Sequence, residues 1–254
     1  MLGISGGDPS FRDDDGSADP SAAVALAAFA AGEGSEHAVL TALADGRLLV
    51  PVVAVLAEQI ARSGSAQAGP GGPGGQHRDT DLAGQAEKTS EMAMPTLIGI
   101  DGRRAVPAFS CLESLRRWQA DARPVPVAAR LVWRAACEES CAVVVDVAGP
   151  VPLAVEGARL AALARGGAAP LPQEDPDVRE AVAAVLAGEL AVAAFRLGPG
   201  DADRDLTIGL VMAPDGAGCD IPELAQRVGD AVMARLGSRL RRGIAIALGS
   251  PQAD

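Results

Sequence analysis

The sequence predicts a mixed α/β and α+β fold in two parts: an N-terminal mixed-sheet domain with flanking helices, and a smaller C-terminal α+β domain. Two continuous apolar runs rich in valine, at 47–56 and 141–147, have the length of buried strands. The pair Asp101-Gly102 separates two further apolar runs, which is typical of a hairpin. Helix signals before, between and after these runs supply the layers that would cover a sheet.

Helix signals recur along the chain as high alanine content, capping residues and apolar positions at helical spacing. They predict helices over 21–31, 37–44, the stretch from Ser110 to Trp118, the stretch after Pro126, 156–165, 177–187 and 221–236. The third of these is expected to begin with a capping box formed by Ser110 and Glu113, and the last with a second capping pair, Asp220 and Glu223. Leu112, Leu115 and Trp118 share one face of it, so Trp118 is expected in the core.

Strand signals alternate with the helices. Strands are expected over 47–56, on both sides of Asp101-Gly102, and over 141–147, 151–155, 190–197, 205–212 and 244–248. Because proline cannot donate a ladder hydrogen bond, Pro51 is expected at a sheet edge or on an unpaired side. Both turn positions, Asp101 and Gly102, are expected to adopt positive φ. The segment Pro124-Val125-Pro126 is expected to separate two helices, the second with Val127 and Leu131 facing inward.

Composition divides the chain into segments. Residues 1–20 are rich in glycine, aspartate, serine and proline and are expected to lack order. Residues 62–80 contain a glycine- and proline-rich run that buries little apolar surface, so a disordered insertion is expected there. The predicted first domain is 21–165, followed by a linker at 166–176 and a second domain at 177–250.

Charge and composition argue against several classes of function. The chain has 22 basic and 33 acidic residues, a formal net charge of -11, which disfavours nucleic acid and anionic membranes as partners. Aromatic residues make up 2% of the chain, too few for a base-stacking surface. No apolar run approaches membrane-spanning length, and the first thirty residues contain Asp13-Asp14-Asp15 where a signal peptide would be basic and then apolar. A cytoplasmic location is expected.

The remaining local clusters receive structural explanations. Arg239, Arg241 and Arg242 are expected to form a solvated helix end, with a basic binding patch as the alternative. The four cysteines have no metal-binding spacing and are expected to be small reduced thiols. They are Cys111, Cys137, Cys141 and Cys219. No metal ion and no cofactor is predicted.

Three residues are candidates for binding. Lys88 is the only lysine among 22 basic residues, and it precedes a strand whose turn carries Asp101. A compact ammonium is chemically distinct from the guanidinium used elsewhere in the chain. Asp146 follows a buried strand, at the position where ligands collect in α/β sheets. Each also has a structural explanation, a salt bridge for Lys88 and a turn cap for Asp146.

No catalytic residue is predicted. Ser110 lacks both a Gly-x-Ser-x-Gly setting and a base nearby in the sequence, so we interpret it as a helix cap. His77 lies within the insertion, and His37 is interpreted as a surface residue in a first helical turn. The glycine-rich run lacks the Lys-Ser/Thr ending of a phosphate-binding loop.

Several of these motifs resemble the SseB family. The run from Asp45 to Val52 is similar to the first strand of that family. The other matching motifs are Glu87-Lys88, Met94-Pro95, Asp101-Gly102-Arg103, the run from Val106 to Ser110 with Leu115 and Trp118, and the run from Asp146 to Pro150. The resemblance covers about 22–165, and from Asp177 the chain looks like the C-terminal domain of the family. It implies a bacterial protein without an agreed enzymatic activity.

The combined expectation is a non-catalytic binding or regulatory protein of the SseB family, acting on a protein partner or a small metabolite. The motivating observation is a strongly patterned scaffold with almost no catalytic inventory. One alternative is an enzyme that uses Lys88 with Asp101 or Asp146. A second alternative, association with a secretion system, follows from family analogy.

Overall fold

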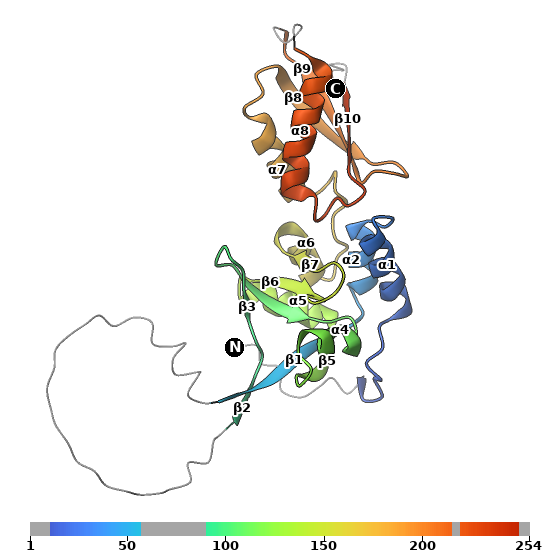
Figure 1. Ribbon diagram of the computed structural model, residues 1–254, viewed down its shortest axis with the longest axis vertical. Helices are drawn as coiled ribbons and strands as arrows, with labels where there is room; N and C mark the ends of the chain where they lie inside the picture. Colours follow the sequence, from blue (N-terminus) through green and yellow to red (C-terminus); the bar gives the residue numbers. More distant parts are fainter. Residues whose placement is uncertain (1–10, 57–89, 215–218, 249–254) are drawn as a thin grey trace, which may run out of the picture.

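The computed structural model of the protein describes residues 11–56, 90–214 and 219–248, with side chains placed outside 54–56 and 90–93. The elements form two groups that follow one another along the long axis of the molecule (Figure 1). One hydrophobic core draws its residues from Ala22 to Ala169, and a second from Val178 to Ile246. The predicted α+β fold is confirmed.

The first sheet of the N-terminal part has three antiparallel strands in the order β2-β1-β5. They are β1 (Arg47–Leu56), β2 (Ser90–Ala93) and β5 (Arg123–Ala128). The expectation that Pro124 and Pro126 separate two helices is therefore wrong, because both lie in β5. Pro124 stands opposite Pro51 of β1, and β5 is an edge strand, which tolerates residues that cannot donate.

The second sheet has four strands in the order β3-β4-β6-β7. They are β3 (Leu97–Ile98), β4 (Arg104–Ala108), β6 (Ala142–Val145) and β7 (Leu153–Val155). β4 and β6 are parallel, and Ala108 pairs with Val145, so the carboxyl ends of both strands meet at one edge of the sheet. A bridge between Leu49 and Phe109 joins this sheet to the first one, with both backbone hydrogen bonds at 2.8 Å.

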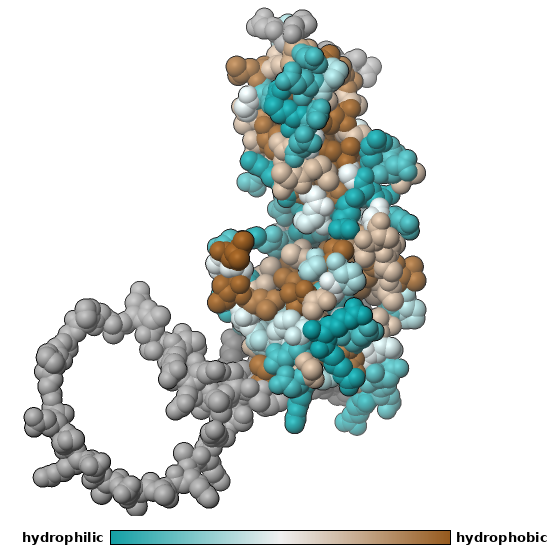
Figure 2. Space-filling view, in the orientation of Figure 1, coloured by the Kyte–Doolittle hydropathy of each residue, from teal (hydrophilic) through white to brown (hydrophobic). Residues whose placement is uncertain are grey.

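The hairpin between β3 and β4 exists, but its turn differs from the expected one. Gly102 has a φ of 79°, whereas Asp101 does not have positive φ. The Asp101 carboxylate accepts a hydrogen bond from Arg103 N at 3.1 Å, which stabilises the turn through the side chain. Ile98 is 74% exposed and Ile100 fully exposed. The hairpin projects from the N-terminal part in Figure 1, and the surface at this place is apolar in Figure 2.

Within the described residues of the N-terminal part, five helices surround these sheets. They are α1 (Pro20–Ala31), α2 (Glu36–Leu43), α4 (Leu112–Trp118), α5 (Ala129–Glu138) and α6 (Gly157–Ala164). α1 and α2 lie side by side at one flank (Figure 1). In α5 the buried residues are Ala129, Val132, Trp133 and Ala136, whereas Leu131 is 47% exposed. The expected inward position of Leu131 is wrong because the helix begins at Ala129, after β5.

The C-terminal part is a three-stranded sheet with two helices. Its elements are α7 (Pro176–Leu186), β8 (Val192–Pro199), β9 (Leu206–Met212), α8 (Ile221–Leu236) and β10 (Ile244–Leu248). The strand order is β10-β9-β8, with β10 parallel and β8 antiparallel to β9. Asp220 caps α8 by accepting from Glu223 N at 3.1 Å, as its sequence spacing predicts.

A buried ionic cluster joins the two parts. Arg239 donates to Glu36 at 3.2 Å and to Asp175 at 2.5 Å, and Arg159 donates to Glu36. Asp175 has no exposed side-chain area, and Arg159 has 3%. Burial raises the pKa of Glu36 above its ordinary range, against the lowering effect of the two arginines. Such clusters are costly to break, because a lost partner leaves a buried charge.

The expectation that Arg239, Arg241 and Arg242 form a solvated helix end is wrong, because each guanidinium is bonded to other groups of the protein. Arg239 lies in the buried cluster, and Arg242 pairs with Asp205 at 2.9 Å. Arg241 donates to the carbonyls of Phe29 and Ala30 at 2.7 and 3.0 Å. These carbonyls end α1, so the positive charge complements the carboxyl end of a helix in the other part of the molecule.

Arg239→Ala tests the ionic cluster. Removal of this guanidinium leaves two buried carboxylates with fewer partners, and we expect the free energy of unfolding to fall by about 3 kcal/mol in urea denaturation. The matched control is Arg227→Ala, whose pair with Glu189 is half exposed and whose loss should cost less than about 1 kcal/mol. Equal losses in the two variants would contradict a stabilising role of the cluster.

Candidate functional site

A cavity of about 220 Å³ lies between α1 and the carboxyl ends of β4 and β6. Its polar floor is formed by Ser110, Ser114 and Asp146, which are all at least nine-tenths buried. Its apolar wall is formed by one face of α1 together with the turn that follows β6. The wall residues are Ala23, Leu26, Ala27, Ala30, Pro150 and Val151.

The parallel pairing of β4 with β6 creates this site. Because both strands run in the same direction, the segments that follow them, 109–111 and 146–151, leave the sheet at one edge. Ligand sites in α/β sheets are common at such an edge. Asp146 is the first residue after β6, and Ser110 is the second residue after β4.

The Asp146 carboxylate accepts three hydrogen bonds. Ser110 N donates at 2.9 Å, Ser110 Oγ at 2.6 Å and Ser114 Oγ at 2.5 Å. The backbone of Asp146 has a φ of 50°, a left-handed conformation that costs energy for a residue with a Cβ. Gly149 N donates to Asp146 O at 2.7 Å. The following turn is thus closed by the backbone, and the turn cap expected from the Asp146 side chain is not formed.

The start of α4 also differs from the expected capping box. The N-cap residue is Cys111, whose Sγ accepts from Ser114 N at 3.5 Å. Ser110 lies one residue earlier, and its hydroxyl is bonded to Asp146. The partner of this hydroxyl is therefore a carboxylate 36 positions away in the sequence. Ser114 was not among the site residues predicted from the sequence. It follows Ser110 by four residues, a spacing that places both at one end of a helix.

The α1 wall explains an unusual sequence. This helix is apolar on all sides, and its residues Ala22 and Phe29 enter the core. Ala23 and Ala27 are exposed and face the cavity instead. Ala23, Leu26, Ala27 and Ala30 follow the spacing i, i+3, i+4, i+7 of a single helix face. Leu26 also packs partly against the core, and the rest of this apolar face is consistent with the lining of a ligand site.

Arg47 connects the site to the segment before α1. Its guanidinium pairs with Asp14 at 2.5 Å, and it donates to Ser17 O at 2.6 Å and Ser110 O at 2.9 Å. Gly16 O accepts from Leu112 N at 2.7 Å. The described part of the segment expected to lack order is thus bonded to both ends of the site. Arg47 belongs to the Asp45-Gly46-Arg47 motif, which the sequence pattern linked to a strand and not to a site.

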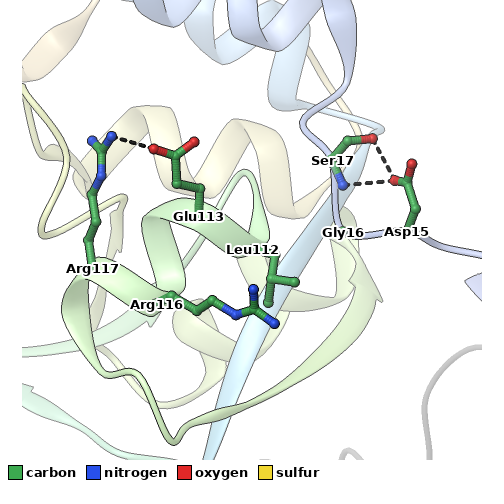
Figure 3. Close-up of a pocket in the computed structure, with 7 residues that line it drawn as sticks. All are labelled: Asp15, Gly16, Ser17, Leu112, Glu113, Arg116 and Arg117. Carbon is green, nitrogen blue, oxygen red and sulfur yellow. Dashed lines mark hydrogen bonds and ion pairs between the residues drawn. The ribbon is translucent and has the colours of Figure 1, made fainter.

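A second, shallower depression of about 530 Å³ adjoins the cavity (Figure 3). It lies between the turn at 15–17 and the exposed side of α4. Arg116 points toward this turn, whereas Arg117 is paired with Glu113 at 2.5 Å. Glu113 and Arg117 also border the cavity, so they form a charged rim between the two hollows.

The three sequence-predicted binding residues do not share one place. Asp146 lies on the cavity floor. Asp101 lies in the hairpin before β4, at the opposite end of the parallel strands, where hydrogen bonds from Arg103 lower its pKa. Lys88 lies outside the described residues.

The cysteine thiols add little to the chemistry of the cavity. All four cysteines are free, and Cys111 lines the cavity. Burial raises the pKa values of Cys137 and Cys141, which keeps these thiols protonated.

In the ranges 11–56, 90–214 and 219–248, no three His, Cys, Asp or Glu side chains are grouped as metal ligands. No helix in the described part of the chain has the length and apolar character needed to span a bilayer.

Comparison with known proteins identifies the architecture around this cavity. The family model described as the SseB protein N-terminal domain matches residues 23–162, more than half of the chain. The chain belongs to the SseB family. The match includes α1 from residue 23 onward, both sheets of the first part and the whole cavity floor of this SseB protein. Neither curated proteins nor solved structures gave a match to the chain.

Ser114→Ala tests the hydrogen bonds on the cavity floor. It removes one of three donors to a buried carboxylate, and hydrogen bonds to charged groups contribute about 1.5–3 kcal/mol. We expect the free energy of unfolding to fall by that amount in urea denaturation. Ser21→Ala, which removes a hydroxyl bonded to the exposed Asp19, should change it by less than about 0.5 kcal/mol. A Ser114→Ala variant as stable as the control would show that Asp146 does not depend on this donor.

Proposed function

We propose that this SseB protein is a non-catalytic binding protein with a regulatory or adaptor role, and that its ligand site is the cavity between α1 and the β4–β6 edge. The supporting observation is the buried Asp146, held in a left-handed conformation beside an apolar wall. Backbone strain and buried polar groups concentrate at functional sites. An apolar cavity with a few convergent polar groups is the usual form of a small-molecule site.

Catalysis by the predicted residues is the alternative. Asp101 and Asp146 lie at opposite ends of the β4–β6 pair, so a single reaction centre would use one of them. The Ser110 hydroxyl donates to Asp146, but His37, the histidine within the described residues, lies on α2 beside Glu36 of the ionic cluster. The alternative is thus a reaction that uses Lys88 with either Asp101 or Asp146.

A protein partner is the second part of the proposal. The hairpin of β3 and β4 presents Ile98 and Ile100 to solvent, away from both hydrophobic cores. Adjacent large apolar side chains at an exposed tip favour a contact with another protein. The cytoplasmic location and the association with a secretion system stay predictions from the sequence.

A fragment screen on the intact chain tests the ligand site. We expect small fragments to shift the amide resonances of 110–114 and 146–151 in nitrogen-15 NMR spectra. Ala27→Trp should abolish these shifts, because Ala27 is exposed on α1 and its enlarged side chain would fill the cavity. Val24→Trp is the control, since Val24 is 71% exposed on the same helix and does not line the cavity.

Two results would contradict the proposal. One is a screen in which no fragment shifts these resonances. The other is a set of shifts that survives Ala27→Trp, which would place the ligand elsewhere. Turnover of a bound compound that Lys88→Arg abolishes would favour the enzyme alternative instead, because this change keeps the charge and alters the geometry.

A further inference from the structure

The floor of the cavity offers acceptors to a ligand. A serine hydroxyl has one proton, and both Ser110 Oγ and Ser114 Oγ lie within 2.6 Å of Asp146 oxygens. Ser114 Oγ also lies 3.0 Å from Cys111 O, a second acceptor for its one proton, and accepts a weak bond from the Cys111 thiol at 3.6 Å. Among the described residues, no donor reaches Ser110 Oγ, and Asp146 Oδ2 accepts one hydrogen bond. Ser110 Oγ and Asp146 Oδ2 therefore have free lone pairs, and a ligand can bond to them by donating a hydrogen bond.

The charge of Asp146 sets it apart from the other buried carboxylates in the described ranges. Each of those has an arginine within ion-pair distance. They are Glu36, Asp175 and Asp205. Asp146 is bonded to a backbone N–H and two hydroxyls, which are neutral. Its negative charge is therefore stabilised by dipoles and not cancelled by a cation.

The arginines near the cavity do not supply that cation. Arg117 at the rim is paired with Glu113 at 2.5 Å. Arg47, behind Ser110, is paired with Asp14 at 2.5 Å. These pairs are neutral as units, so the cavity carries one uncompensated negative charge. A positively charged donor is favoured there over a neutral or anionic one.

The size and lining of the cavity limit the rest of the ligand. An apolar cavity of about 150 Å³ holds a benzene molecule, so 220 Å³ suits a ligand of roughly six to ten non-hydrogen atoms. Leu26, Ala27 and Val151 offer an apolar surface above the polar floor. A short aliphatic or small cyclic body fits this lining better than a polar one.

We infer that the cavity binds a small primary amine in its protonated form. The ammonium donates to Ser110 Oγ and Asp146 Oδ2, and the apolar body lies along α1. This inference rests on the proposed function, because it names the ligand class for the same cavity.

The test compares three compounds with one carbon skeleton at pH 7: 3-methylbutylamine, 3-methylbutanol and 3-methylbutanoate. Their head groups are cationic, neutral and anionic. Binding to the full chain is followed by the amide shifts of 110–114 and by protection of Cys111 from N-ethylmaleimide, with Cys219 of the C-terminal part as internal control. We expect the amine to bind at least tenfold more tightly than the alcohol, and the carboxylate to show no binding.

Two variants connect that preference to the charge on the floor. Asp146→Asn should reduce the advantage of the amine over the alcohol to less than threefold, because the uncompensated charge is lost. Glu113→Gln provides a second measurement on an exposed side chain, where a substitution is expected to change the stability of the fold little. It frees the positive charge of Arg117 at the rim, and we expect it to weaken the amine at least twofold without changing the alcohol.

The outcomes separate this inference from the proposed function. If the alcohol or the carboxylate binds as tightly as the amine and Ala27→Trp abolishes binding, the amine inference is overturned and the ligand site stands. If none of the three binds, the inference is overturned, and the wider fragment screen decides the ligand site. An amine preference that both charge variants leave unchanged would also overturn it.

Discussion

The set of hydrogen bonds on Asp146 is the constraint on which the candidate site depends. A buried carboxylate without partners costs several kcal/mol, and three donors offset that cost here. These donors come from the segment after β4, whereas the carboxylate comes from the segment after β6. The bonds therefore hold two loops together across 32 to 36 residues of chain. Gly149 belongs to the same arrangement, because a Cβ at this position would lie 2.9 Å from Asp146 O. The geometry of the cavity floor follows from this one group.

The wall of the cavity is held in a different way. α1 is apolar around its circumference, and its burial alone does not fix its position precisely enough to shape a small cavity. Arginines act on both of its ends. Arg47 binds Asp14 and Ser17 O before the helix, and Arg241 binds the carbonyls of Phe29 and Ala30 at its end. The guanidinium group suits this role, because its donors form a rigid planar fork that binds several acceptors at once. Since Arg241 belongs to the C-terminal part, one helix contributes both to the cavity and to the contact between the two parts.

The structural features that were predicted correctly from the sequence are those that local residue patterns determine. The buried strands, the hairpin at Asp101-Gly102 and the cap of α8 depend on neighbouring residues, and they are present. Asp146 was selected because it follows a buried strand, and it does line a cavity. β5 was missed because Pro-Val-Pro is locally a helix boundary, and its strand state depends on pairing with β1, which lies 71 to 81 residues earlier in the chain. The partners of Asp146 were missed because the parallel β4–β6 pairing, which brings Ser110 and Ser114 to it, leaves no mark in the sequence around either serine.

The distribution of buried charge gives the last step of this comparison. Glu36, Asp175 and Asp205 meet arginines, and these ion pairs satisfy groups that hold the C-terminal part together or join it to the first part. An ion pair is nearly neutral as a unit, so it attracts a third charged group only weakly. Asp146 meets hydroxyls and a backbone N–H, so its charge and one of its lone pairs remain open to the cavity. Within the described residues, the carboxylate that is stabilised without being neutralised is the one that borders an apolar cavity. This difference is the physical basis of the proposal that Asp146 serves a ligand as well as the fold.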